Sequence, residues 1–190
     1  TKRILAVSIG LFLAGIVLGA CDGGEASPTF YIAGIPDQNA AKLARRYEAL
    51  TSYLEEKLGV DVKFVPTVYY AATVVAFERG DVQMAWFGGL TGVQARRMVP
   101  GSEAIAHRPR DARFHSKFIV QTDLEVDGLK DLRGLTITFG SESSTSGHLM
   151  PRHFLLEAGL DPDDDFKGSP SYSGSHDKTW KLVESGAFQA

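Results

Sequence analysis

Five hydroxyl side chains and one glycine crowd into a short stretch near the middle of the chain. They are Ser141, Ser143, Ser144, Thr145, Ser146 and Gly147. An apolar segment that predicts a strand, 135–140, comes before them, and a segment that predicts a helix, 146–159, follows. The N–H groups and positive dipole end of a helix start attract anions, hydroxyls add donors, and glycine lets the backbone approach a ligand closely. The stretch therefore predicts a site for a small oxyanion.

The same stretch also has a purely structural interpretation, in which Ser144, Thr145 or Ser146 caps the helix and does nothing more. One cap uses one hydroxyl, which leaves the other donors for a ligand. The phosphate-loop patterns GxxxxGKS and GxxxxGKT and the dinucleotide pattern GxGxxG do not occur in the sequence. Nucleotides are therefore disfavoured as ligands.

A second polar stretch, 172–180, places Ser173, Ser175 and His176 before another predicted helix, with Asp177 in its first turn. His176 could donate to an anion from the rim of the same cleft, or it could be a surface histidine beside a helix cap. The adjacent Ser175, His176 and Asp177 do not predict a catalytic triad, because neighbouring side chains diverge where a triad needs them to converge.

Two aromatic stretches lie where predicted strands end in the first half of the chain. One begins a helix with Tyr69 and Tyr70, and the other holds Trp86, Phe87, Gly88, Gly89 and Thr91. Such aromatic side chains either line a pocket or fill the core under a loop. Tyrosine is the better ligand candidate, because its hydroxyl can donate while its ring excludes water.

The spacing of the histidines predicts no metal site, and no cofactor is predicted either. His148 and His153 lie five positions apart, which misses the four-residue spacing of helical histidine pairs, and His107 and His115 have no ligand partner at a recognisable spacing. The formal net charge is −3 and no run of Lys or Arg occurs. We therefore expect no nucleic-acid partner.

These stretches belong to a regular alternation of predicted strands and helices. Strands are predicted at 29–36, 60–66 and 82–88, and helices at 37–59, 70–79 and 90–99. This order favours a parallel sheet covered by helices on both faces, so the predicted fold class is α/β.

The second half continues the alternation less regularly. Strands are predicted at 103–108, 115–122, 135–140 and near 169–174, a polar crossover at 123–134, and helices at 146–159 and 175–186. We divide the chain into a first α/β lobe, 30–122, and a second α/β lobe, 123–190. An α/β lobe usually has four or more strands, so we expect the second lobe to be truncated and to continue past Ala190.

The N-terminus has the pattern of an export signal. A short basic start precedes an apolar run, 4–17, which is short for a membrane span. We predict a signal peptide over 1–20 and a flexible tether over 21–29. The residues around Cys21 resemble a bacterial lipobox, which implies that Cys21 is lipidated and anchors a periplasmic or extracytoplasmic protein to the cell membrane.

A family resemblance rests on the leader and on three stretches, YYAATVVAFERGDVQMAWFGG, SESSTSGHLMP and YSGSHDKTWKLVESG. Together they resemble the phosphonate/phosphite-type periplasmic solute-binding proteins of ABC transporters. The resemblance implies two lobes of type II binding-protein architecture, which close about a hinge on a ligand. It implies a monomer that hands its ligand to a membrane permease, touches the membrane only through its lipid anchor, and catalyses nothing.

The resemblance also implies which residues contact the ligand. Ser144, Thr145 and Ser146 would hold the oxyanion, and Gly147 would let the backbone approach it closely. His176 and Tyr70 would contact it from the two lobes. His115 stands where an aromatic contact, usually tyrosine, is common in the family.

Several alternatives stay open at this point. The oxyanion could be a phosphonate, phosphite, phosphate, sulfate or selenate, and SESSTSGHLMP resembles a subgroup proposed for selenate-like ligands. Acidic ligand contacts of the family would lie past Ala190. One rival is an enzyme on the same fold, with Ser144 or Ser146 as nucleophile and His176 as base in phosphoryl or acyl transfer. Another is the ligand-binding domain of a sensor.

Overall fold

Three parallel strands form the sheet of the first half of the chain, in the order β2–β1–β3. The structure is a computed structural model that describes residues 28–190, so the predicted signal peptide and Cys21 lie outside the described residues. The strands are β1 (Phe30–Gly34), β2 (Val62–Val65) and β3 (Met84–Trp86). All pairings are parallel, with Ile32 of β1 opposite Phe64 and Met84. The predicted parallel sheet is confirmed.

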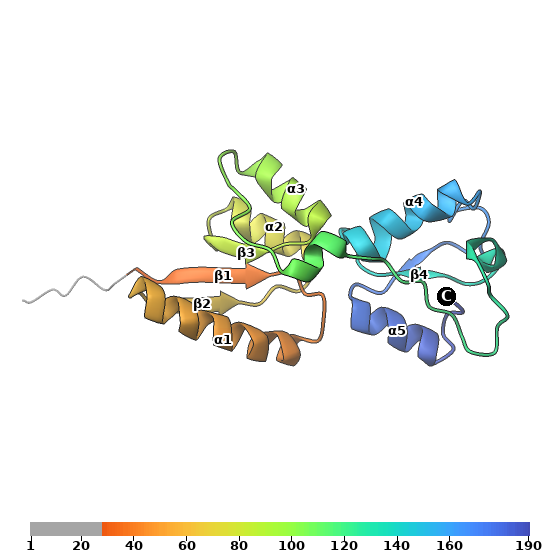
Figure 1. Cartoon of the computed structure of the whole chain (residues 1–190), viewed down its shortest axis with the longest axis horizontal. Helices are drawn as coiled ribbons and strands as arrows, with labels where there is room; N and C mark the ends of the chain where they lie inside the picture. Colours follow the sequence, from red (N-terminus) through yellow and green to blue (C-terminus); the bar gives the residue numbers. More distant parts are fainter. Residues whose placement is uncertain (1–27) are drawn as a thin grey trace, which may run out of the picture.

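Helices cover both faces of this sheet, with α1 on one side and α2 and α3 on the other (Figure 1). They are α1 (Ala40–Leu58), α2 (Tyr70–Glu78) and α3 (Gly89–Met98). α1 begins after Asn39, whose side chain accepts a hydrogen bond from the Ala41 N–H at 2.9 Å. It ends at Gly59, whose φ of 68° lies in the left-handed region that glycine tolerates best.

The core of the first lobe lies between α1 and the sheet. Ile32, Leu43, Tyr47 and Val62 are its buried members, and the Tyr47 ring stacks on Phe64 with 4.2 Å between centroids. Gly34 lies directly beneath this ring. A Cβ at position 34 would stand 1.7 Å from the Tyr47 hydroxyl oxygen, so only glycine fits there.

The second half contains a smaller parallel sheet, β4–β5. Its elements are η2 (Leu129–Leu132), β4 (Thr138–Phe139), η3 (Thr145–Leu149), α4 (Met150–Glu157), β5 (Ser171–Tyr172) and α5 (His176–Glu184). Its core is formed by Leu132, Ile137, Phe139, Leu155, Leu160, Phe166 and Ala190. On the open side of β4, Thr138 N–H donates to the Ala190 carbonyl at 2.9 Å, and Ala190 N–H donates to the Thr136 carbonyl at 3.0 Å. The last residues thus extend the sheet beside β4.

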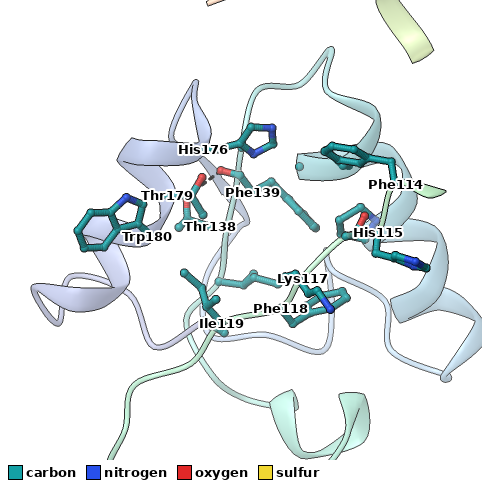
Figure 2. Close-up of a pocket in the computed structure, with 17 residues that line it drawn as sticks. Phe114, His115, Lys117, Phe118, Ile119, Thr138, Phe139, His176, Thr179 and Trp180 are labelled. Atoms are coloured by element: carbon teal, nitrogen blue, oxygen red, sulfur yellow. Dashed lines mark hydrogen bonds between the residues drawn. The ribbon is translucent and has the colours of Figure 1, made fainter. Parts of the chain in front are cut away.

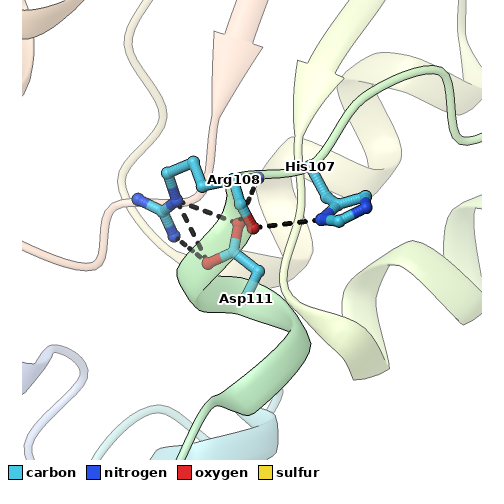
Figure 3. Close-up of polar contacts among 3 residues, drawn as sticks. All are labelled: His107, Arg108 and Asp111. Atoms are coloured by element: carbon cyan, nitrogen blue, oxygen red, sulfur yellow. Dashed lines mark hydrogen bonds and ion pairs between the residues drawn. The ribbon is translucent and has the colours of Figure 1, made fainter.

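The connection between the two halves passes through η1 (Pro109–Arg113), which lies between them in Figure 1. Arg108, just before η1, donates to the Asp111 carboxylate, with 2.7 Å between Nη2 and Oδ1 (Figure 3). This hydrogen-bonded guanidinium holds the pKa of the Asp111 carboxyl below its usual range. The guanidinium also lies 5.0 Å from the Trp86 ring, which ties the connection to β3.

Two predicted strands are absent from this connection. Residues 103–108 and 115–122 are irregular, because neither segment has a continuous backbone ladder with a neighbour; a bond from Gln121 N–H to the Gln189 carbonyl at 3.1 Å stands alone. Phe118 and Val120 nevertheless pack against the core of the second half. The division into lobes at 122 and 123 stays a prediction, and we use "first lobe" and "second lobe" for the parts built around the two sheets.

Candidate ligand-binding site

The hydroxyl-rich loop turns tightly between β4 and α4. Gly140 N–H donates to the Gly147 carbonyl at 2.7 Å, so the two ends of the loop meet. Ser144 is 3% exposed, and its hydroxyl accepts a hydrogen bond from the Gly147 N–H at 3.0 Å. Ser144 is therefore the helix cap, as one of the sequence interpretations allowed. Capping occupies a lone pair of the hydroxyl and leaves its proton available to an anion.

The loop enters α4 through the π-helical turn η3. Leu149 N–H donates to the Ser144 carbonyl at 3.0 Å, five residues back, and Met150 N–H bonds to the Thr145 carbonyl in the same way. Single turns of π-helix are rare in proteins overall, and those that occur are often found at functional sites. The first N–H groups of the turn, those of Thr145 and Ser146, have no acceptor within it. The turn thus presents free amides beside the hydroxyls.

The side chain of His148 holds this loop in place through hydrogen bonds at both of its ring nitrogens. Its Nδ1 lies 2.8 Å from the Glu142 carbonyl oxygen, and its Nε2 lies 3.1 Å from the Tyr172 hydroxyl oxygen. Because a carbonyl can only accept, Nδ1 carries a proton, and in the neutral imidazole Nε2 then accepts from the Tyr172 hydroxyl. The ring also packs edge-on against Phe139, with 5.0 Å between centroids. His148 therefore joins the loop to β4 and β5, a role that the sequence did not indicate.

Tyr70 supplies a buried hydroxyl from the first lobe. It is the first residue of α2, is 2% exposed, and its hydroxyl is the one buried side-chain polar atom without a hydrogen-bond partner in residues 28–190. Burial raises the pKa of this phenol, the charge of Asp37 raises it further, and the neighbouring Ser144 side chain lowers it. Ser144 is thus close to the phenol without completing a hydrogen bond. At neutral pH the phenol is protonated and can donate.

His176 is the first residue of α5, directly after Ser175. Its backbone N–H donates to the Asp37 carbonyl of the first lobe at 3.2 Å. Its ring lies against the loop, since a Cβ at Gly147 would stand 3.2 Å from His176 Cε1. Ser175 donates its hydroxyl to the Asp177 carboxylate at 2.7 Å. Asp177 is therefore engaged with Ser175, in keeping with the expectation that these three residues form no catalytic triad.

Thr145 reaches across to the first lobe in the opposite direction. Its hydroxyl oxygen accepts a hydrogen bond from the Leu90 N–H at 2.7 Å, in the first turn of α3. The side chain packs on Gly89, where an added Cβ would stand 3.0 Å from Thr145 Oγ1. Thr145 and His176 therefore both join the two lobes.

A cavity of about 290 Å³ opens beside the hydroxyl-rich loop in the second lobe (Figure 2). Ser146, Gly147 and His176 border it, and His115 and Lys117 lie on the segment across from β4. Much of the remaining wall is apolar, from Phe114, Phe118, Ile119, Phe139 and Trp180. The structure thus brings His115 to the same cavity as three of the predicted loop and helix residues, whereas Tyr70, Ser144 and Thr145 stand at the contact between the lobes.

Sequence reasoning missed the main-chain groups at this contact. The Asp37 carbonyl and the Leu90 N–H have no signature in residue type, because every residue but proline carries both groups. One signal was present in the chain: Gly88 ends the predicted apolar strand 82–88 and Gly89 follows it, at a point where glycine permits close approach of another backbone or side chain.

Residues 28–190 contain no group of three or more His, Cys, Asp or Glu placed to hold a metal ion. None of their helices combines the length and the apolar character needed to cross a membrane.

Residues 32–190 match the family model described as "ABC transporter, phosphonate, periplasmic substrate-binding protein". The chain is 46% identical over 166 residues to the probable ABC transporter phosphite-binding protein PhnD1 of Prochlorococcus marinus (strain MIT 9301), covering 84% of this chain and 56% of that protein. It is 30% identical over 172 residues to the phosphate-import protein PhnD of Mycolicibacterium smegmatis, covering 85% and 54%.

A solved structure gives the same result in three dimensions. The structure of PhnD1 from Prochlorococcus marinus in complex with methylphosphonate matches with a TM-score of 0.74 and 40% identity, covering 85% of this chain and 61% of that chain. The chain spans about half the length of the curated relatives it matches.

Proposed function

Because the chain belongs to the family of periplasmic phosphonate-binding proteins of ABC transporters, we propose that it captures a small phosphorus oxyanion between its two lobes for delivery to a membrane permease. Phosphite and methylphosphonate are the first ligands to consider, since one relative is named for phosphite and its solved structure holds methylphosphonate.

The buried Tyr70 hydroxyl carries this proposal. A buried hydroxyl without a partner costs about 1–3 kcal/mol, so a structure keeps one where a ligand can complete it. This hydroxyl stands beside Ser144, at the amide-rich start of the π-turn. A tetrahedral anion at this point would accept from the phenol of the first lobe and from the hydroxyls and amides of the second.

We assign the ligand contacts as follows. Ser144, Thr145 and Ser146 donate from their hydroxyls or amides, Gly147 keeps the backbone close, and His176 donates from the start of α5. His115 faces the adjoining cavity and would contact a substituent on the ligand rather than its oxygens. The serine, threonine, tyrosine and main-chain donors are neutral, so they would hold the anion by dipoles and hydrogen bonds.

Binding without chemistry is the favoured reading. The family is one of transporter binding proteins, and Asp177 is hydrogen-bonded to Ser175 instead of orienting His176. A Ser/His enzyme would need that orienting group. We propose a monomer with a permease partner, in the periplasmic location of its family, and anchoring through a lipid on Cys21 is part of the same proposal.

Isothermal titration calorimetry tests the site. Thr145→Val combined with Ser146→Ala should weaken the binding of phosphite and methylphosphonate at least about tenfold, the size expected for lost hydrogen bonds to a charged group. The sequence offers a matched control, because Thr51→Val with Ser52→Ala makes the same changes on α1. Equal affinity of the two double variants would remove the site from this loop.

The ligand class is tested by the same titration with phosphate, sulfate and selenate. We expect phosphite or methylphosphonate to bind most tightly. The enzyme alternative predicts turnover of a chromogenic phosphate ester by the purified protein, and we expect none.

A further inference from the structure

Thr145 makes a side-chain hydrogen bond between the hydroxyl-rich loop and the first lobe. Its hydroxyl oxygen accepts from the Leu90 N–H at 2.7 Å. Leu90 is the second residue of α3, and the first four N–H groups of a helix have no acceptor within the helix. Thr145 therefore satisfies an amide at the positive end of α3, from the other lobe.

The hydrogen-bonding capacity of threonine leaves a further role. A hydroxyl has one proton and two lone pairs, and the Leu90 N–H uses only a lone pair. The proton of Thr145 is thus free to donate to an anion at the start of η3. Donors arranged in series strengthen one another, so an anion on this proton makes the oxygen a better acceptor for Leu90. Each hydrogen bond then favours the other.

Gly89 is what lets the two lobes come this close. An added Cβ would stand 3.0 Å from Thr145 Oγ1, 3.5 Å from its Cγ2 and 3.7 Å from its Cβ. Gly92, one turn further along α3, provides a contrast: its added Cβ would come no closer than 3.5 Å to Phe87, within the first lobe. The two glycines share a helix, and only Gly89 faces the second lobe.

A second contact supports the same arrangement. His176, another proposed ligand residue, donates its backbone N–H to the Asp37 carbonyl of the first lobe at 3.2 Å. The unpartnered Tyr70 hydroxyl, 2% exposed, independently marks a ligand position beside Ser144. The groups that would hold the anion and the groups that join the lobes are therefore partly the same residues.

We propose that Thr145 couples anion capture to lobe closure, by donating its proton to the ligand while its oxygen accepts the amide at the start of α3, and that Gly89 is required for this contact. The proposal rests on the function proposed above. It predicts that the anion stabilises the closed arrangement through α3, although the proposed ligand contacts include no side chain of α3.

Gly89→Ala in the full-length protein, with Gly92→Ala as the matched control, tests the coupling. The loop of the second lobe is unchanged in both variants. We expect Gly89→Ala to weaken binding of phosphite and of methylphosphonate by about tenfold, the lower part of the usual range of coupling between sites. Gly92→Ala should bind as the unmodified protein does.

Small-angle X-ray scattering measures lobe closure separately from the affinity for the anion. The unmodified protein and Gly92→Ala should contract on adding phosphite, whereas Gly89→Ala should contract less at saturating phosphite. Thr145→Ser in the Gly89→Ala background removes the Cγ2 methyl group, 3.5 Å from the new Cβ, and keeps Oγ1, which is nearer at 3.0 Å. Because a serine side chain is less restricted in χ1 than threonine, its hydroxyl can move away from the new Cβ, and this double variant should restore part of the contraction.

The outcomes separate the two proposals. If the unmodified protein binds phosphite or methylphosphonate, and Gly89→Ala binds and contracts as Gly92→Ala does, the coupling through Thr145 is overturned while the proposed function stands. If the unmodified protein binds neither anion, the proposed function fails, and the coupling falls with it.

Discussion

The two lobes reach the candidate site by different structural means. The first lobe offers regular elements: a three-stranded sheet, a nineteen-residue helix and a phenol fixed by burial at the start of α2. The second lobe offers two-residue strands and a loop held by its own hydrogen bonds and a π-turn. Damage to the first lobe should therefore appear chiefly as lost stability, and damage to the second chiefly as lost binding.

The largest effect is expected from Gly34→Ala in the first lobe. Its Cβ would overlap the Tyr47 hydroxyl at 1.7 Å and the ring at 2.5 Å, so we expect a loss of about 3 kcal/mol or more in the free energy of unfolding. Urea denaturation measures it. Gly128→Ala, with no atom within 4 Å of the added Cβ, is the control. Equal stability of the two variants would show that the close packing of Tyr47 on Gly34 does not stabilise the first lobe.

Alkaline pH should lower the stability of the first lobe more than that of the second, because the buried tyrosines, Tyr47 and Tyr70, belong to the first lobe. Burial raises the pKa of Tyr47 to about 12, while an unfolded tyrosine ionises near pH 10. The folded state favours the neutral phenol, so the contribution of Tyr47 to the free energy of unfolding is complete below about pH 10. This contribution, up to about 2–3 kcal/mol, is lost as the pH rises to about 12. Tyr47→Phe should flatten this decline, and Tyr53→Phe, at an exposed position, should not.

Tyr70→Phe should separate stability from binding. It removes an unpartnered buried hydroxyl, so the ligand-free protein should be unchanged or stabilised by up to about 1 kcal/mol. Phosphite binding should weaken about tenfold, because a donor to the anion is lost. Thermal unfolding and calorimetry measure the two quantities. Tyr69→Phe, at the exposed neighbouring position, is the control, and a Tyr70 variant that binds phosphite as this control does would place the ligand elsewhere.

The smallest effect is expected at His148, behind the loop. His148→Asn keeps a donor near the position of Nδ1 and can still bond to the Glu142 carbonyl, whereas His148→Gln places its amide near Nε2 and loses that bond. We expect Gln to weaken phosphite binding about threefold more than Asn, the size of one modest hydrogen bond. If both variants bind phosphite equally, the hydrogen bond from His148 to the Glu142 carbonyl does not position the loop.

The sequence predicted the regular elements of the first lobe closely. The spacing of apolar residues predicted a helix over 37–59, and the structure has α1 at Ala40–Leu58, with Gly59 at its end. The strand–helix order predicted the parallel pairing of the sheet. It failed at 103–108 and 115–122, where each segment holds a short apolar run but no neighbouring strand completes a ladder. Strand propensity is a property of a residue, whereas a strand needs a partner.

The candidate site was predicted in part. Hydroxyl density before a helix pointed to Ser144 through Gly147, and Tyr70 and His115 came from the family resemblance. The contact of Thr145 with Leu90 could not be predicted, because a backbone N–H carries no residue signature and the lobes approach each other only in the fold. Ligand roles for these residues stay predictions until binding is measured.

The bonds that join the lobes also bear on how this protein can change during evolution. On the first-lobe side they engage main-chain atoms, the carbonyl of Asp37 and the amide of Leu90. Side chains at positions 37 and 90 can therefore be exchanged without losing those partners, except for proline at 90. Variation among natural relatives should accumulate there more freely than at positions 89 and 145, where a single added or missing atom changes how the halves meet.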